Sequence, residues 1–349
     1  MAVSTGRDPV ATRAALAAWL QAQTGARHVA VGELTIPGLS GFSNETLLFD
    51  AVWDGDVHPL VIRVEPTGHT VFPSTAFDAQ VRVMQALREE GSVPVPEVRW
   101  FEEGTDVLGA RFVCMGRVEG EVPADNPGYH GEGWMPALDE AGRRRVWESG
   151  LDTMAAIHRL DRDAVGLGWI ADVSPADQLQ LDHEYRTFAC GDMPYPVVDR
   201  AFELLEASIP SPSPRPSLCW GDSRIGNMIF GADQQVAAVL DWEMVTAGDP
   251  VQDLAWYLLL DHHHTLAFEV PRLAGLPARE ESVARWEAAS GHSAEHLDWY
   301  ELLGTARYAS IMVRVMKLLD STGVFPGAAE AAFDQTGTRL LADLLDQRY

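Results

Sequence analysis

The sequence predicts an α+β protein made of a small lobe with an antiparallel sheet and a larger, mainly helical lobe. Up to about residue 115, short apolar runs alternate with turn residues, a pattern typical of strands. Beyond that point, the apolar residues recur mainly at helical spacing. We therefore expect one lobe over residues 1–115 and a second over residues 116–349, around one large core or two modest ones.

The first lobe is expected to begin with a helix and to continue as strands. Helical spacing runs from Pro9 to Gln23. Two apolar runs around a Gly/Ser/Asn loop follow, and an Asp-Gly-Asp turn at 54–56 leads into a third strand. A helix over Ala76–Arg88 then interrupts the sheet. Two last strands are expected at Val98–Glu102 and Ala110–Val118.

Helical periodicity is strong in four stretches of the second lobe. These are Glu140–Leu160, Val197–Ile209, 276–290 and 298–320. A proline-rich connector, S-I-P-S-P-S-P-R-P at 208–216, acts as a rigid spacer before the segment with the candidate chemistry.

The composition excludes several classes of partner. The chain of 349 residues is 46% hydrophobic and 22% charged, and its formal net charge is −25. This charge repels nucleic acid and anionic membrane surfaces, so neither is an expected partner, whereas a cationic substrate is weakly favoured. A well-solvated surface is the simpler explanation of the acidity.

Cysteine spacing and the N-terminus indicate a cytoplasmic protein. Cys114, Cys190 and Cys219 are far apart and odd in number, which argues against a disulfide framework and a zinc site. The first residues lack a basic segment followed by an apolar one, and no stretch approaches the roughly 18 apolar residues that span a bilayer. The sequence does not indicate the oligomeric state.

The strongest functional signal is C-W-G-D-S-R-I-G-N-M-I-F at 219–230. Asp222 and Asn227 have the D-x-x-x-x-N spacing of a protein-kinase catalytic loop. Phosphoryl transfer requires a carboxylate that deprotonates the acceptor hydroxyl, and oxygen ligands that hold Mg²⁺ against the phosphates. We predict that Asp222 is the catalytic base and Asn227 a magnesium ligand. Taken alone, such a pair would more commonly form a turn or a helix cap.

A predicted hairpin supplies a second metal ligand. M-I-F at 228–230 and V-A-A-V-L at 236–240 flank a short turn, so that Asn227 precedes the first strand and Asp241 follows the second. Antiparallel pairing would bring the two residues together, and their oxygen atoms suit Mg²⁺ better than zinc or copper. His262–His264 form no comparable site, because three consecutive residues cannot all face one ion, and we expect a solvated helix end there.

These motifs resemble the aminoglycoside-phosphotransferase and choline-kinase-like family, whose signature H-G-D-x-x-x-x-N precedes a metal-binding Asp. W-G-D-x-x-x-x-N at 220–227 and L-D-W-E at 240–243 match it. G-F-S-N-E-T at 41–46 and D-W-Y-E-L-L at 298–303 are most similar to the kinase-like domains associated with acyl-CoA dehydrogenases. The resemblance spans roughly residues 16–340. It implies a bilobal protein-kinase-like fold, ATP or GTP as the phosphate donor, and a small hydroxylated acceptor.

The resemblance also assigns residues to the nucleotide. It implies that Gly38–Asn44 covers the phosphates, that Asp253 is a brace that does not itself contact the ligands, and that R-F-V-C-M-G-R-V-E-G at 111–120 is the strand and hinge between the lobes. An ordinary buried strand is the alternative for the last segment. The nucleotide-binding residues that it implies are Gly41, Ser43, Asn44, Arg63, Met115 and Val118.

Three positions depart from the family pattern. Kinases usually place a Lys on the third strand, paired with a helix Glu, but this chain has Arg63 and Gln80 there. A guanidinium still binds phosphate bidentately and stays charged, so Arg63 keeps a phosphate role. Trp220 replaces the usual His, whose role is to brace the catalytic loop.

The predicted function is an ATP- or GTP-dependent phosphotransferase that acts on the hydroxyl of a small molecule, such as an amino sugar, an amino alcohol or a hydroxyacyl compound. The alternative is a kinase-like module that binds a nucleotide or metabolite with little or no turnover, which Arg63 and Gln80 would favour. Retention of Asp222, Asn227 and Asp241 argues for the enzyme. An acidic helical scaffold would leave that constellation unexplained.

Overall fold

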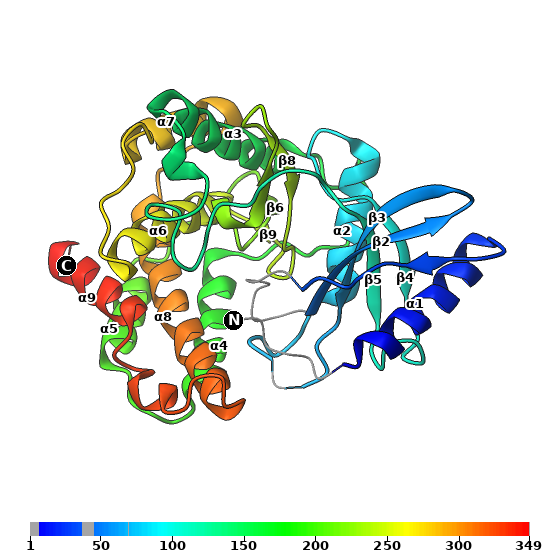
Figure 1. The fold of residues 1–349 in the computed structure, drawn as a ribbon. Helices are drawn as coiled ribbons and strands as arrows, with labels where there is room; N and C mark the ends of the chain where they lie inside the picture. Colours follow the sequence, from blue (N-terminus) through cyan, green and yellow to red (C-terminus); the bar gives the residue numbers. More distant parts are fainter. Residues whose placement is uncertain (1–6, 37–44, 69, 349) are drawn as a thin grey trace.

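A computed structural model describes residues 7–36, 45–68 and 70–348 and shows two lobes side by side (Figure 1). The N-lobe, on the right of Figure 1, holds a five-stranded sheet and two helices. The C-lobe, on the left, is built mainly of helices. The predicted α+β architecture is therefore confirmed.

The N-lobe sheet is antiparallel throughout, with strand order β1-β2-β3-β5-β4. Two helices pack on it, one on each face. The side chains of β5 alternate between them, since Cys114 joins the α1 core and Met115 joins the α2 core. The elements are α1 (Pro9–Thr24), β1 (Ala30–Val31), β2 (Glu45–Trp53), β3 (Asp56–Val64), α2 (Phe77–Glu90), β4 (Val98–Glu102) and β5 (Phe112–Gly116).

The β2–β3 hairpin sets the position of Arg63. Its two-residue turn places Asp54 and Gly55 at φ values of 55° and 91°, the left-handed conformation that suits a tight hairpin. The register that follows puts Arg63 opposite Thr46 on β2 and Val113 on β5. Arg63 therefore lies in the middle of the sheet, on a strand with neighbours on both sides.

The long helix α8 (Leu297–Ser321) is the centre of the C-lobe and packs against α4, α5, α6 and α9. The other helices are α3 (Glu140–Arg159), α4 (Pro175–Cys190), α5 (Pro196–Glu206), α6 (Val251–Ala267), α7 (Arg279–Ser290) and α9 (Thr336–Arg348). The four helical stretches that the sequence predicts correspond to α3, α5, α7 and α8. We did not single out α4, α6 or α9 from the sequence.

Two short antiparallel strand pairs carry the motif residues between α5 and α6. β6 (Ser217–Cys219) pairs with β9 (Thr246–Gly248), a pairing that the sequence analysis missed. β7 (Met228–Phe230) pairs with β8 (Val236–Val239), with Met228 opposite Val239. The predicted hairpin is therefore present.

The lobes are joined at several places. One is the chain itself, which leaves β5 at Gly116. Another is the hydrogen bond from the Val239 amide of β8 to the Pro94 carbonyl (2.8 Å). A third is a segment between β3 and α2, here called the crossing loop (described residues 65–68 and 70–76). Its Thr70 carbonyl accepts a hydrogen bond from Arg314 Nε (2.9 Å), and its Val71 carbonyl accepts one from the Tyr185 hydroxyl (3.0 Å). Both donors belong to C-lobe helices, so the crossing loop ties the N-lobe sheet to α4 and α8.

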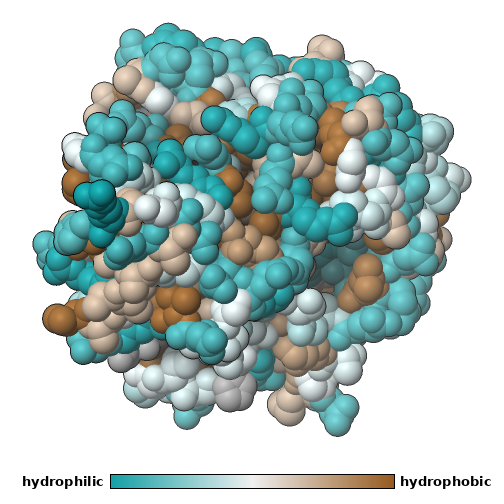
Figure 2. All heavy atoms as spheres, turned by 90° about the vertical axis from the view of Figure 1, so that its right-hand side faces the viewer, coloured by the Kyte–Doolittle hydropathy of each residue, from teal (hydrophilic) through white to brown (hydrophobic). Residues whose placement is uncertain are grey.

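On the face that the N-lobe presents, hydrophilic residues prevail and apolar residues form small separate groups (Figure 2). This distribution agrees with a formal net charge of −25. Within the described ranges, the helices are all too short or too polar to be candidate membrane spans.

One buried ion pair provides a test of the helix packing. Asp182 on α4 is 4% exposed and accepts two hydrogen bonds from Arg307 on α8, at 2.7 and 2.9 Å. Asp182→Ala would leave a buried guanidinium without its carboxylate, so we expect the free energy of unfolding to fall by about 3–5 kcal/mol in chemical denaturation. Glu203→Ala, which breaks an exposed pair with Arg200, should leave stability unchanged. Equal effects of the two variants would contradict the prediction.

Candidate active site

A cavity of about 630 Å³ lies between the lobes. One part of its wall, here called the apolar lining, consists of Leu48, Val61, Met84, Met115, Ile229 and Leu240. The other part, here called the polar lining, consists of Arg63, Asp125, Arg224, Asn227 and Asp241. The sheet supplies residues from one side and the loops around the β7–β8 hairpin supply residues from the other. An elongated ligand with an apolar and a charged end would match this division.

Asp222 is connected to the polar lining by hydrogen bonds. Its Oδ2 accepts from Asn227 Nδ2 (2.6 Å) and from Arg224 Nε (3.3 Å), and both donors line the cavity. Its Oδ1 accepts from the indole nitrogen of Trp256 (2.8 Å). Donors on both carboxylate oxygens hold the group in one orientation. The side chain remains 16% exposed, so a hydroxyl could still approach it.

The structure brings Asn227 and Asp241 to the same cavity. They lie at the base of the β7–β8 hairpin, where the Leu240 amide donates to the Asn227 carbonyl (2.8 Å). The Asn227 side-chain nitrogen donates to the carbonyl and the carboxylate of Asp222. The amide oxygen of Asn227, on the other side of the amide carbon, is therefore the atom left for a metal.

Asp241 has an unusual backbone that Trp220 supports. Its φ of 57° lies in the left-handed region, which is uncommon for a residue other than glycine. The Trp220 indole N–H donates to the carbonyls of Leu240 (2.8 Å) and Asp241 (3.1 Å). Trp220 therefore fixes the end of the hairpin, which is a bracing role of the kind expected at this position.

The donor set at this site fits Mg²⁺. An amide oxygen and a carboxylate are hard ligands, and Mg²⁺ typically takes only one or two protein ligands together with phosphate oxygens and water. No group of three or more His, Cys, Asp or Glu side chains in the described ranges could form a protein cage for a metal. Asn227 and Asp241 would therefore hold the ion jointly with a phosphate ligand.

Arg63 does not pair with helix α2 in this structure. Its Nη2 lies 3.2 Å from Asp241 Oδ1, and its side chain is 15% exposed. Gln80 on α2 is 3% exposed, and its side-chain amide donates a hydrogen bond to the Thr75 carbonyl (2.8 Å). This bond satisfies a backbone acceptor just before the helix. The positive charge on β3 is therefore anchored to the candidate metal carboxylate instead of to a helix.

Asp253, at the start of α6, supports the loop that carries Asp222. Its fully buried carboxylate accepts hydrogen bonds from the backbone amides of Trp220 (2.7 Å) and Gly221 (2.9 Å) and pairs with His158 Nε2 (2.9 Å). The Trp286 indole donates to His158 Nδ1, so Nε2 carries the proton of the neutral ring. Gly221 has a φ of 91°, and a Cβ there would lie 2.1 Å from the Met244 carbonyl oxygen, so only glycine fits.

Part of the expected nucleotide site lies outside the described residues. Gly38, Gly41, Ser43 and Asn44 belong to the undescribed range 37–44. Met115 and Val118 both line the cavity. Two hinge amides are used within the N-lobe, because Gly116 donates to Glu97 and Arg117 donates to Pro59. The hinge groups left for a nucleobase are therefore other backbone atoms of this segment.

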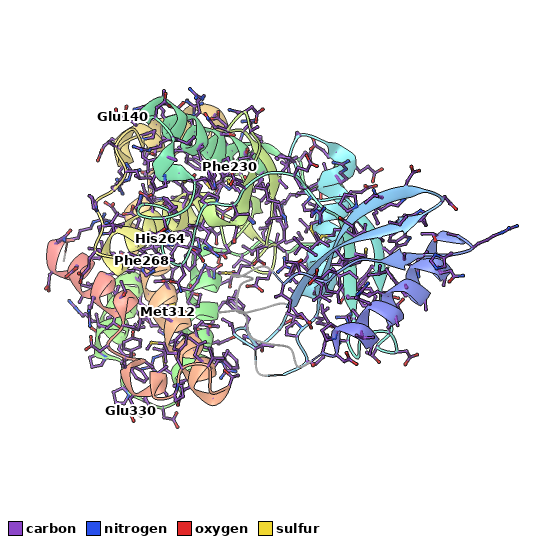
Figure 3. All side chains as sticks on the ribbon, in the orientation of Figure 1. Glu140, Phe230, His264, Phe268, Met312 and Glu330 are labelled. Carbon is purple, nitrogen blue, oxygen red and sulfur yellow. The ribbon has the colours of Figure 1, made fainter. Side chains whose placement is uncertain are left out.

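The expectation of a solvated helix end at His262–His264 is wrong for two of the three residues. Only His262 is exposed, while His264 is 6% exposed and its Nε2 lies 3.1 Å from Asp125 Oδ1. His263 is half-buried and its Nε2 bonds the Tyr308 hydroxyl (2.9 Å). Figure 3 shows His264 on α6 beside Phe268, within the C-lobe. The helix continues past these residues and turns two of them inward.

Sequence analysis missed Trp256, Arg224 and Asp125. Arg224 lies within the quoted motif, and its charge two residues after Asp222 was a usable signal. Trp256 is one apolar residue in a helix buried on nearly every side, so nothing in the sequence distinguishes it. Asp125 lies in a loop about a hundred residues from its partner Arg224, and only the fold pairs them.

The brace at Asp253 predicts a large stability effect. Asp253→Ala would leave two backbone amides and the His158 ring without their acceptor, at about 1–3 kcal/mol for each buried donor. We expect a loss of at least about 3 kcal/mol in the free energy of unfolding, measured by chemical denaturation. Asp253→Asn keeps one acceptor oxygen and should lose less. An alanine variant as stable as the parent would show that other contacts hold the loop.

His263 predicts a dependence of stability on pH. Burial, aided by the neighbouring His264, lowers the pKa of His263 from 6.5 to about 3. Below pH 6.5 the unfolded chain therefore binds a proton that the folded protein excludes. This contribution is absent above pH 6.5 and lowers stability as the pH falls toward 3, by up to about 1.4 kcal/mol per pH unit.

The variant His263→Gln should remove this contribution. Between pH 6.5 and pH 5, the free energy of unfolding should then fall less steeply in the variant than in the parent, as measured by urea denaturation. Superimposable slopes would show that His263 takes up protons equally in the folded and unfolded chains.

Solved structures share this two-lobe fold. A Ralstonia eutropha protein assigned to the aminoglycoside phosphotransferases has a TM-score of 0.67 and 24% identity, over 95% of this chain and 98% of that chain. A thermostable variant of aminoglycoside phosphotransferase APH(4)-Ia, in ternary complex with AMP-PNP and hygromycin B, has a TM-score of 0.58 and 16% identity, over 94% and 98%. At these identities the likeness shows the fold alone, and it confirms the predicted protein-kinase-like fold.

Curated relatives confirm the resemblance seen in the motifs. Acyl-CoA dehydrogenase family member 10 of Mus musculus is 31% identical over 205 residues, which cover 57% of this chain and 18% of that protein. Acyl-CoA dehydrogenase family member 11 of Homo sapiens is 27% identical over 240 residues, which cover 64% and 29%. The matched region is thus less than a third of either relative. The profile of the Phosphotransferase enzyme family matches residues 35–295, three quarters of the chain, and the protein belongs to that family.

Proposed function

We propose that the protein is a small-molecule kinase that transfers the γ-phosphate of ATP or GTP to a hydroxyl group. The observation that carries this proposal is the joint position of Asp222, Asn227 and Asp241. Asn227 and Asp241 line one cavity between the lobes, and Asp222 is hydrogen-bonded to Asn227 at 2.6 Å. Few arrangements other than phosphoryl transfer require a carboxylate beside two hard metal ligands in such a cleft.

Each residue has a defined task in the proposed reaction. Asp222 orients the acceptor hydroxyl and accepts its proton, while Trp256 and Asn227 keep the carboxylate aimed. Asn227 and Asp241 would hold Mg²⁺, which when bound neutralises phosphate charge. Arg63, 3.2 Å from Asp241, adds a cation on the N-lobe side of the phosphates.

The cavity supports a nucleotide as the donor. Its volume of about 630 Å³ lies within the usual range of ligand pockets, and its apolar lining next to the hinge suits a nucleobase. Met115 and Val118 would border the base. The APH(4)-Ia neighbour is described with AMP-PNP, which supports a nucleoside triphosphate here as well.

The acceptor is proposed only as a class, a small molecule with a free hydroxyl. The APH(4)-Ia neighbour is described with hygromycin B, which supports a small-molecule acceptor. One scaffold serves many substrates, so the acceptor has to be identified by experiment. We further propose a cytoplasmic location, in line with the cysteine spacing and the acidic composition.

A kinase-like binding module without turnover is the second candidate. It is favoured by Arg63, which engages Asp241 instead of a carboxylate on α2, and by Gln80, which is used inside the N-lobe. This arrangement would hold a nucleotide with altered phosphate geometry. Measured turnover separates the two candidates.

A screen of alcohols by ATP and GTP consumption, with and without Mg²⁺, tests the proposal. We expect at least one hydroxylated acceptor to be phosphorylated in a reaction that chelation of Mg²⁺ abolishes. Nucleotide binding without turnover on any acceptor would favour the binding module, and absence of nucleotide binding would overturn both candidates.

The variant Asp222→Ala tests the catalytic base. Turnover should fall by roughly 100- to 10,000-fold, because the acceptor loses the group that takes its proton, while nucleotide affinity stays nearly unchanged. Asp106→Ala, an exposed residue of the N-lobe, is a matched control that should retain full turnover. Parental activity in the Asp222 variant would remove this residue from the mechanism.

A further inference from the structure

The guanidinium of Arg224 is held in the polar lining by two carboxylates. Its Nε lies 3.3 Å from Asp222 Oδ2 and its Nη1 lies 2.6 Å from Asp125 Oδ1. These bonds fix the plane of the group. Its Nη2 donates to no other group in the part of the chain that the structure describes. A planar, fixed guanidinium in the wall of a cavity, with one nitrogen unused, is well suited to bind an anion.

Asp125 is itself fixed from two sides. Its Oδ1 also lies 3.1 Å from His264 Nε2 on α6. Its segment is joined to the hairpin at Glu121, which exchanges two backbone hydrogen bonds of 2.9 Å with Phe230. Figure 3 labels Phe230 and His264, on the two elements that hold this segment. Burial alone would raise the pKa of Asp125, but the charge of Arg224 and the His264 contact hold it well below its ordinary range.

The excess of negative charge at this site favours a cation near the acceptor hydroxyl. Three carboxylates, Asp125, Asp222 and Asp241, accompany two guanidinium groups in and beside the polar lining. A nucleoside triphosphate adds about four negative charges, of which one Mg²⁺ balances only two. Arg63 touches the metal carboxylate, whereas Arg224 touches the catalytic base. The two arginines therefore contact different residues of the candidate site.

We propose that Arg224 contacts the γ-phosphate of the bound nucleotide, and so makes the site prefer a triphosphate over a diphosphate. The inference rests on the proposed function, because it presumes that the cavity takes a nucleotide. The transferred phosphoryl group has to lie next to the hydroxyl that Asp222 orients, and Arg224 is bonded to Asp222. A diphosphate lacks the group that reaches this position. A positioned guanidinium there would also stabilise charge during transfer.

The test compares the affinities of the full chain for Mg·AMP-PNP and Mg·ADP, by isothermal titration calorimetry. Arg224→Gln should weaken binding of AMP-PNP by about 10- to 100-fold and binding of ADP by less than about 3-fold. Arg144→Gln removes an arginine of α3 that pairs with Glu148 and Glu281, and should change neither affinity. Equal losses for both nucleotides, or no loss, would make Arg224 a structural ion-pair residue and overturn the proposal.

Two further variants keep the result decisive. Arg224→Gln with Asp125→Asn removes both charges of this pair, so that Asp125 is not left as a charge without its guanidinium, and should show the same selective loss if the single variant unfolds. Repeating Arg224→Gln in an Asp222→Asn background removes the repulsion between an unpaired Asp222 and the γ-phosphate. A selective loss that persists there supports direct contact, and one that disappears overturns it. A parent that binds neither nucleotide would instead refute the proposed function.

Discussion

The carboxylate of Asp253 is the interaction on which the rest of the site depends. Because it is fully buried and accepts from the amides of Trp220 and Gly221, it fixes the backbone from which Asp222 projects. Other contacts of the site build on this one. Asp222 accepts hydrogen bonds from Asn227 and Arg224. The Trp220 indole holds the end of the β7–β8 hairpin, which places Asp241 next to Arg63. Removal of the charge beneath the loop would therefore loosen several groups together.

Polar residues with fixed spacing made the motif predictable from the sequence. The motif D-x-x-x-x-N is followed by a hairpin and a further Asp, and this order strongly constrains the backbone. Asn227 and Asp241 could therefore be placed near one another from the sequence alone. The sheet was predictable for a similar reason, because turn residues such as Asp54 and Gly55 separate its apolar runs. In both cases the information is local in the chain.

What escaped prediction depends on burial or on distance along the chain. Helix α6 has buried residues around most of its circumference, so it lacks the polar face that makes a helix recognisable, and Trp256 and the inward histidines were lost with it. The pairing of Asp125 with Arg224, and of Arg63 with Asp241, joins residues 99 and 178 positions apart. Spacing in the sequence gives no information about pairs so far apart, and only the packing of the two lobes brings these side chains together.

The crossing loop has a consequence for motion. A lobe joined to its neighbour only by the covalent chain could move away from it as a rigid body. Here the N-lobe also accepts hydrogen bonds from Tyr185 and Arg314 through the crossing loop, and from Val239 through Pro94. Contacts at several separate points oppose separation of the lobes more than they oppose a small twist of the sheet over the helices. Exchange of a bound molecule would then proceed by such a twist, or would wait for those hydrogen bonds to break.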